Sequence, residues 1–573
     1  MRMSSHRMQL STAAGALMLL GGVAFGQQHV TDTVHNLSVS GPGQVRAVSE
    51  QQVCIFCHAP HHTSGERPLW NREAPATSYT IYESSTLDAQ PNQPTGASKL
   101  CLSCHDGTIA LGSVLSRADR IRMVGGDFMP AGLSNLGTDL SDDHPVSFYY
   151  TSGLAAADRQ LLSPVALPTE VSLDSEGRLQ CTSCHEPHNN THGDFLVLDN
   201  VYSALCVACH RMDGWSSGSH ALSGAAMPLE PTLDWPYSTV AENGCRCCHR
   251  SHAAGGHERL LIFKEEEANC LDCHDGSIGN DIRTESLKPS AHDPTRYLGA
   301  HDPVEDLSGD QVHVECVDCH NPHAATNQPP PTGYIPIGAT LAYVRGVTFG
   351  GTAIDQANAE YEVCFRCHGD AAVPVPQQIA RQSQTSNLRL KFSPTNPTFH
   401  PVVSSSPSSD TVSLVPGLAN GALIRCTDCH NNDAGPGAGG MGPQGPHGSI
   451  HDFLLERNYT IYDDTDESEY EYAMCYKCHQ RSVVLSGRSF NKHRLHVVNK
   501  RTPCSVCHDP HGVSLTVGTS SDHTHLINFD TVVVRPEPTT GRLEFRDQGS
   551  FAGSCTLVCH GSVHLDTSYH HGP

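Results

Sequence analysis

Twenty-four of the 25 cysteines in this sequence stand in twelve pairs, and a histidine directly follows each pair. Two residues separate the cysteines in eleven pairs, and three residues separate them in the last. The paired cysteines are Cys54 and Cys57, Cys101 and Cys104, Cys181 and Cys184, Cys206 and Cys209, Cys245 and Cys248, Cys270 and Cys273, Cys316 and Cys319, Cys364 and Cys367, Cys426 and Cys429, Cys475 and Cys478, Cys504 and Cys507, and Cys555 and Cys559. The histidines after them are His58, His105, His185, His210, His249, His274, His320, His368, His430, His479, His508 and His560.

This spacing has a chemical reason. Two cysteines three positions apart on a helical turn can each add to one vinyl group of the same porphyrin, and the adjacent histidine then lies under the iron. Disulfides or zinc sites are the alternatives, but neither explains a histidine after every second cysteine. We therefore predict twelve haem c groups, although the extra residue before Cys559 alters the thioether geometry of the last one. Cys247, outside the pairs, is expected to be an idle neighbour.

The sixth coordination position of each iron decides between electron conduction and catalysis. The chain has 38 histidines, and 25 remain once the twelve proximal ones and His6 are set aside. Only six methionines follow Gly26. Bis-histidine ligation is therefore predicted for the twelve irons. Without methionine ligands, and in an acidic chain, the haems should have low reduction potentials.

The twelve motifs form six successive pairs, which is the sign of an internal repeat. In five pairs another histidine follows the first motif's histidine at an offset of three; these are His61, His188, His252, His323 and His511. In the pair opened by Cys426, either His447 or His451 could take this role. A more distant histidine follows each second motif, namely His144, His220, His301 or His292, His400, His496 or His493, and His564.

The offset of three limits what these histidines can bind. Three residues span at most about 10 Å, which is too short to wrap round a porphyrin and reach the far face of the same iron. Each should therefore ligate a neighbouring haem, so that neighbouring haems lie close together. The alternative is that such a histidine caps a turn or binds a propionate.

Several segments resemble multihaem c-type cytochromes of metal- and sulfur-respiring bacteria. They are His35-Asn-Leu-Ser, CIFCHAPH from Cys54, PLWNR from Pro68 and CLSCHDGTIALG from Cys101. A second module of those proteins is similar to the region from Gly445 through HRLHVVNKRTPCSVCHDPHGVS and HLINFD to GSCTLVCHG. The resemblance implies bis-histidine haems, a distal ligand at His35, and periplasmic or extracellular electron transfer; some relatives form filaments. The middle of the chain matches by pattern only.

Residues 1–26 have the form of a secretory signal peptide. Arg2 and Arg7 precede an apolar stretch from Ala13 to Phe25 that is too short and too rich in glycine to span a bilayer. Because covalent haem attachment requires export, we expect a periplasmic or extracellular protein that is not embedded in a membrane.

Composition predicts the fold class. Aromatic residues are 6% of the chain, while glycine and proline number 50 and 37. Such a chain is poor in ordinary core, so packed haems should replace it. We predict a multihaem cytochrome c fold with little regular structure, short helices at the motifs and long loops around a chain of haems. Short strands are expected at 146–151, 195–198 and 453–462.

Segments rich in proline, glycine and serine suggest block boundaries in the mature chain. The predicted blocks are 27–160 with two haems, 161–305 with four, 306–420 with two and long loops, and 421–573 with four. One continuous row of haems with insertions is the alternative.

Charge and ligation limit the function. The formal charge of −24 disfavours nucleic acid and anionic lipid. The expected partners are other redox proteins such as cytochromes, another copy in a haem-chain filament, and a metal-oxide surface or an outer-membrane conduit. An acidic surface can also serve solubility alone. We favour an electron-transfer protein over an enzyme; the alternative is a reductase of nitrite, hydroxylamine or a sulfur oxyanion, with one open iron.

Overall fold

The computed structural model describes residues 29–61, 69–228, 235–256, 258–297, 313–326, 337–370, 378–405 and 411–570. The chain forms two compact units. The first consists of residues 1–77, 94–137 and 169–200, and the second of residues 78–93, 138–168 and 201–573. The expected signal peptide at 1–26 lies outside the described residues, and the four predicted haem blocks stay a prediction.

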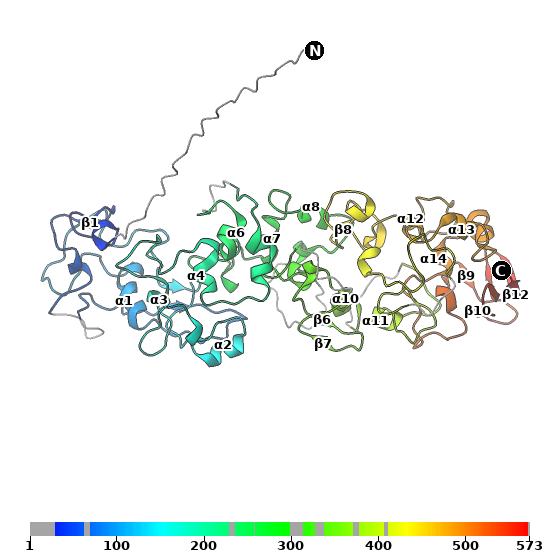
Figure 1. Cartoon of the computed structure of the whole chain (residues 1–573), viewed down its shortest axis with the longest axis horizontal. Coiled ribbons are helices and arrows are strands. Elements are labelled where there is room, and N and C mark those ends of the chain that lie inside the picture. Colours follow the sequence, from blue (N-terminus) through cyan, green and yellow to red (C-terminus); the bar gives the residue numbers. More distant parts are fainter. Residues whose placement is uncertain are drawn as a thin grey trace, which may run out of the picture. The chain divides into compact units, whose positions relative to one another are not determined.

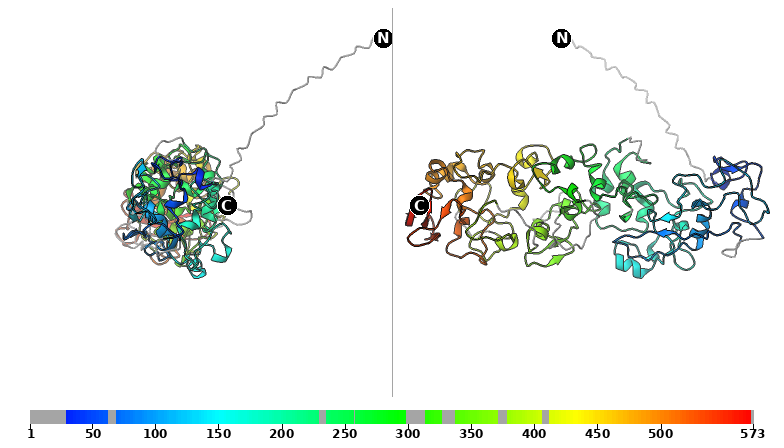
Figure 2. Two further views of the ribbon diagram at one scale, coloured as in Figure 1. Left: turned by 90° about the vertical axis from the view of Figure 1, so that its left-hand side faces the viewer. Right: turned by 180° about the vertical axis from the view of Figure 1, so that it is seen from behind.

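Regular structure is sparse, and the helices are short (Figures 1 and 2). The longest, α1, has only 10 residues. The helices are α1 (Gly96–His105), α2 (Ser152–Asp158), α3 (Cys181–Cys184), α4 (Ala204–Val207), α5 (Ser219–Leu222), α6 (Val240–Asn243), α7 (Glu266–Leu271), α8 (Ile282–Ser286), α9 (Cys316–Cys319), α10 (Glu360–His368), α11 (Leu388–Lys391), α12 (Ala473–Tyr476), α13 (Arg481–Leu485) and α14 (Cys504–Cys507). Among the described residues, no helix is long and apolar enough to cross a membrane.

Many of these helical turns are the cysteine motifs themselves, and local capping explains where they begin. In three motifs the residue before the second cysteine accepts a hydrogen bond from the backbone N–H of the residue that precedes the motif. Ser183 Oγ accepts from Gln180 at 3.1 Å, Asp318 Oδ2 from Glu315 at 2.8 Å, and Asp428 Oδ2 from Arg425 at 2.7 Å. The motif thus caps its own first turn.

The strands are mostly two-residue pairings. The strands are β1 (Arg46–Ala47), β2 (Thr80–Ile81), β3 (Met123–Val124), β4 (Asp139–Leu140), β5 (Ser290–Ala291), β6 (Gly346–Val347), β7 (Ala353–Ile354), β8 (Gly448–Ser449), β9 (Val534–Arg535), β10 (Glu544–Asp547), β11 (Ala552–Cys559) and β12 (Ser562–His570). β2 and β4 pair in parallel, whereas β1–β3, β5–β8 and β6–β7 are antiparallel. The larger antiparallel sheet has the order β10-β11-β12, and β9 also pairs antiparallel with β11.

Buried apolar side chains form small separate clusters. One in the first unit contains Ile55, Phe56, Val114 and Ile121. Another lies against the C-terminal sheet and contains Val506, Phe529, Val534, Phe545 and Leu557. A loop-rich chain with short helices and a few small sheets fits the expected cytochrome c-like fold.

The three predicted strands are wrong. Range 195–198 contributes a single bridge between Leu196 and His185, and range 453–462 a single bridge between Leu455 and His430. Range 146–151 also forms no strand, and α2 begins at Ser152, directly after it. The first two segments contact the backbone of a motif histidine instead of another strand, so their apolar residues serve the motif.

Candidate haem-binding sites

The backbone of the Cys-x-x-Cys-His motifs gathers their three functional side chains on one turn. In nine motifs the histidine N–H donates to the carbonyl of the first cysteine at 2.8–3.0 Å, as from His58 to Cys54 and from His508 to Cys504. This bond closes one α-helical turn. All 25 cysteines are described, and no two of them form a disulfide. The disulfide alternative therefore finds no support in the geometry.

Ten of the twelve motif histidines face a second histidine that comes from elsewhere in the chain. Their ring centroids lie 6.0–6.5 Å apart. The pairs are His35 with His105 (6.2 Å), His58 with His188 (6.2 Å), His144 with His210 (6.3 Å), His220 with His274 (6.2 Å), His249 with His323 (6.3 Å), His292 with His368 (6.2 Å), His320 with His447 (6.0 Å), His400 with His479 (6.5 Å), His430 with His511 (6.0 Å), and His493 with His508 (6.3 Å).

This separation fits one metal ion between two imidazoles. Two imidazole–metal bonds of about 2 Å, together with a ring radius of about 1 Å on each side, separate the ring centres by about 6 Å. Burial lowers the pKa of three of them, His210, His323 and His447, to about 4. These three imidazoles are therefore neutral at pH 7, which is the form that binds metal.

Hydrogen bonds at Nδ1 orient the proximal rings. In seven of them Nδ1 lies 2.7–2.9 Å from an oxygen, so that Nε2 points away from that oxygen. The contacts are His105 to Ser134 O, His185 to Asp194 O, His249 to Arg259 O, His320 to Thr340 O, His430 to Phe453 O, His479 to Ser413 Oγ, and His508 to His525 O.

Four of these carbonyls belong to a repeated turn that the sequence analysis missed. Two successive residues there have left-handed backbone angles: Asp194 and Phe195, Arg259 and Leu260, Phe453 and Leu454, and His525 and Leu526, with φ between 47° and 63°. The next residue bridges to the histidine backbone. Such angles cost free energy for residues other than glycine and often mark functional sites. The only sequence signal is an apolar dipeptide ending in leucine or isoleucine.

A second set of hydrogen bonds, to proline carbonyls, orients the distal rings. The carbonyl of Pro187 accepts from His35 Nδ1 at 3.2 Å, and that of Pro322 accepts from His220 Nδ1 at 2.8 Å. The carbonyls of Pro510 and Pro446 accept from His400 and His292 in the same way. Each proline directly precedes His188, His323, His511 or His447. One Pro-His dipeptide therefore contributes to two neighbouring histidine pairs.

Three of the five offset-three histidines face motifs other than their own. His188 faces His58, His323 faces His249, and His511 faces His430, and in every case one further motif lies between the two in sequence. His447, one of the two candidates for the pair opened by Cys426, faces His320, and again one further motif lies between the two in sequence.

Some predicted ligands have another environment. His61 is exposed and has no ring contact among the described residues, and His301 lies outside them. His292 and His493, the alternatives to His301 and His496, face His368 and His508. His496 stacks on Phe490 at 5.9 Å, and its Nδ1 lies 3.0 Å from Lys492 O. His252 differs from these, because its Nδ1 lies 2.8 Å from Asp143 Oδ1 in the way that Nδ1 contacts orient the paired rings, and its role as a ligand stays a prediction.

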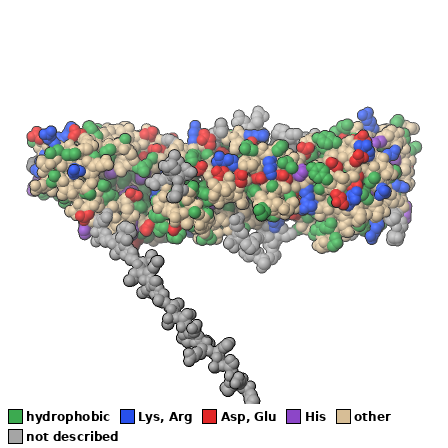
Figure 3. All heavy atoms as spheres, turned by 90° about the horizontal axis from the view of Figure 1, so that it is seen from above, with side chains coloured by type: hydrophobic (Ala, Val, Ile, Leu, Met, Phe, Trp, Pro, Cys, Tyr) green, Lys and Arg blue, Asp and Glu red, His purple; other side chains and the backbone are tan. Residues whose placement is uncertain are grey.

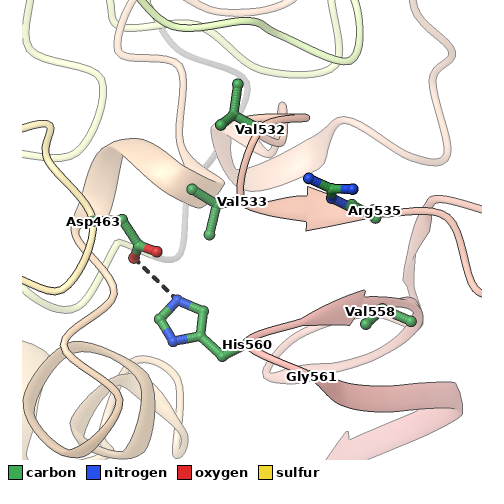
Figure 4. Close-up of a pocket in the computed structure, with 7 residues that line it drawn as sticks. All are labelled: Asp463, Val532, Val533, Arg535, Val558, His560 and Gly561. Atoms are coloured by element: carbon green, nitrogen blue, oxygen red, sulfur yellow. Dashed lines mark hydrogen bonds and ion pairs between the residues drawn. The ribbon is translucent and has the colours of Figure 1, made fainter.

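The twelfth motif is built differently. Cys555 and Cys559 lie on β11, where residues four apart are separated by about 13 Å, against about 5 Å for residues three apart on a helical turn. His560 has a φ of 49°, and its Nε2, rather than Nδ1, lies 3.0 Å from Asp463 Oδ1. Figure 4 shows this contact in a cavity of about 460 Å³ that Arg535 and Val533 also line. Within the described chain, His560 has no histidine partner.

Cysteine contacts connect neighbouring motifs. The thiols of Cys101 and Cys181 interact, and this contact and burial raise the pKa of Cys101. First cysteines meet in the same way at Cys206 and Cys245, Cys270 and Cys316, Cys364 and Cys426, and Cys475 and Cys504. Second cysteines are electrostatic neighbours at Cys57 and Cys104, Cys248 and Cys273, Cys319 and Cys367, Cys429 and Cys478, and Cys507 and Cys559. The two kinds of contact alternate along the second unit.

The sequence matches a family model described as a doubled CXXCH motif, over residues 175–214 and 238–278. These ranges contain the four motifs that open at Cys181, Cys206, Cys245 and Cys270. No curated protein matches the chain. The doubled motif indicates a multihaem c-type cytochrome that binds haem c covalently and transfers electrons.

Proposed function

We propose that the chain is a dodecahaem cytochrome in which each iron is held by two histidines. It conducts electrons between periplasmic donors and periplasmic or extracellular acceptors, either alone or as a filament subunit. The observation that carries this proposal is the set of ten facing histidine pairs. Bound haem supplies one-electron oxidation and reduction at its iron.

The protein's own residues would fix the cofactors rather than react with them. Paired cysteines would hold each porphyrin edge, and the motif histidine with its partner would close both faces of the iron. The Nδ1 contacts keep each imidazole in one tautomer and one orientation. At the ten histidine pairs, both axial positions of the iron would be filled by imidazole. Substrates would then be kept from these irons, which favours electron conduction over catalysis.

Contacts between neighbouring motifs support transfer along the chain. The alternating cysteine contacts bring attachment points of successive haems together, so porphyrin edges bonded there would lie close. Rigid histidine ligation on both sides would also keep each iron in the same coordination in both oxidation states.

The location and partners follow from the sequence. The signal-like segment 1–26 supports export. The acidic composition favours a basic redox protein, a metal oxide or a conduit in the outer membrane over nucleic acid. Acidic and basic side chains lie side by side on the face in Figure 3, so a partner would meet mixed charges there.

Mass spectrometry and electron paramagnetic resonance of the purified holoprotein test the proposal. Twelve covalent haems and only low-spin ferric signals are expected. A colourless protein, or one that contains zinc, would refute haem binding, and a large high-spin fraction would refute bis-histidine ligation. Electron microscopy of the secreted fraction tests for filaments.

A reductase remains a second candidate because of one observation, the environment of His560. Its ring faces Asp463 beside a cavity instead of a second histidine. An iron at this site without a sixth protein ligand would bind carbon monoxide when reduced. Binding of one carbon monoxide per chain, lost in a Cys555→Ala/Cys559→Ala variant, would favour the reductase. No binding would favour His496 as the sixth ligand.

A further inference from the structure

The guanidinium of Arg72 is enclosed by protein in the first unit. Arg72 is fully buried, with 0% of its surface exposed. Its five N–H groups all reach oxygens, namely Ser103 Oγ and the carbonyls of Ser103, Ala110, Leu111 and Ser113, at 2.8–3.3 Å. All of these acceptors are uncharged. In the part of the chain that the structure describes, Arg72 is therefore a buried cation held without a carboxylate partner.

Lys391, the other buried cation in the described chain, is paired with a carboxylate, and so are the half-buried Arg366 and Lys288. Lys391 contacts Asp509 at 2.9 Å, and Arg366 contacts Asp318 at 3.2 Å. Lys288 contacts Asp433 at 2.7 Å. The positive charge of each is largely cancelled at short range, whereas that of Arg72 is not.

Arg72 stands between the first two cysteine motifs. Its neighbour Asn71 donates its backbone N–H to the carbonyl of Cys57 at 2.9 Å. Ser103, which accepts from Arg72, lies inside the motif of Cys101 and Cys104.

A fixed positive charge favours the reduced form of a neighbouring redox group, because reduction adds a negative charge. Inside the protein this effect is stronger than in water and is little screened by salt. Asp106 is buried and directly follows the histidine of the second motif, so its negative charge opposes the effect there. Ala59 and Pro60 follow the histidine of the first motif, so no such charge stands directly after it, and the first motif should feel Arg72 most.

We infer that Arg72 is a positioning residue that raises the reduction potential of the haem on Cys54 and Cys57 and, less strongly, of the haem on Cys101 and Cys104. The inference rests on the proposed function. It makes these two sites an exception to the low potentials expected elsewhere, so electrons would collect in the first unit when the chain is partly reduced.

A spectroscopic redox titration of full-length holoprotein tests this inference. Arg72→Met removes the charge, Arg72→Lys keeps it, and Arg117→Gln removes an exposed arginine of the same unit, whose partner is Glu50. In Arg72→Met, the equilibrium constant for the first reduction steps should fall about tenfold, so the highest reduction potential should fall by about 59 mV for a one-electron step. Arg72→Lys should keep most of the potential, and Arg117→Gln all of it.

Structural and electrostatic roles give different results. Both Arg72 variants should melt at lower temperature, because neither methionine nor lysine can satisfy five acceptors. An unchanged titration in Arg72→Met with full haem content would overturn the inference, as would an equal shift in Arg72→Lys. If Arg72→Met does not fold, Ser103→Asp places a carboxylate against the intact arginine. A lowered first potential would then support the inference, and an unchanged one would overturn it. Absence of haem from the wild-type protein would instead refute the proposed function.

Discussion

Replacing His323 by alanine tests the ligand pattern most directly. His323 follows the motif of Cys316 and Cys319, but its ring faces His249, which belongs to the motif of Cys245 and Cys248, at 6.3 Å and an interplanar angle of 12°. His323→Ala should therefore leave the iron on Cys245 and Cys248 with one axial ligand. The iron on Cys316 and Cys319 should keep both of its ligands, since His320 faces His447.

The expected size of the effect follows from the neighbours. Trp215 is the other ring within 6.3 Å of His323, and indole does not ligate iron. His220 and His210 lie in the vicinity, but the ring of His220 faces His274 and that of His210 faces His144. With no substitute imidazole, one complete iron per chain should become high spin. Electron paramagnetic resonance measures this, and carbon monoxide binding by the reduced protein should rise by one equivalent.

Two further variants locate the affected iron. In a Cys245→Ala/Cys248→Ala background, His323→Ala should add no high-spin signal. His61→Ala, which removes the histidine at the same offset after the first motif, is the matched control and should change nothing, because His61 is exposed without a ring contact in the described chain. A high-spin signal from the iron on Cys316 and Cys319, or none at all, would show that the pairing is misread.

Three other predictions concern stability. Asp194→Val forces a β-branched residue into a backbone φ of 47° at the turn that holds His185, so it should lower the free energy of unfolding by about 1–2 kcal/mol. Asp194→Gly should not lower it. Equal melting temperatures of the two variants would contradict the strain argument. Burial raises the pKa of Glu267 from 4.5 to about 7, so the folded chain binds a proton there more tightly than the unfolded chain does, and this contribution to stability is lost as pH rises from 4.5 through 7. Glu267→Gln should therefore stabilise by up to about 3 kcal/mol at pH 8 and by nothing at pH 4, and parallel pH profiles would rule this out. Asp509→Ala leaves Lys391 buried without its partner and should destabilise by about 3–5 kcal/mol in denaturant unfolding, while Lys391→Met/Asp509→Leu should recover most of the loss.

The attachment chemistry could be predicted from sequence because it is local. A Cys-x-x-Cys-His pentapeptide forms one turn whatever surrounds it, and the short reach from His320 to His323 already required a different iron for His323. Which iron that was depends on how distant segments fold together. The pairing of His323 with His249 therefore became visible only in the structure.

The choice between nearby histidines also needed the structure. His493 and His496 lie on the same turn, and spacing could not decide which ring would face His508. The predicted strands failed for a related reason. Phe453 favours extended structure, but tertiary packing places Phe453 and Leu454 in left-handed conformations, so that the carbonyl of Phe453 reaches His430.

The Pro-His dipeptides explain how so little regular structure can hold many cofactors in order. The ring of His323 faces His249, while the carbonyl of Pro322, one peptide away, orients His220 against His274. A shift of this dipeptide would disturb two histidine pairs at once, whereas loss of the His323 side chain alone leaves the carbonyl in place. Neighbouring sites are thus tied together through the backbone, and the order of the motifs in the chain becomes the order of their contacts in space.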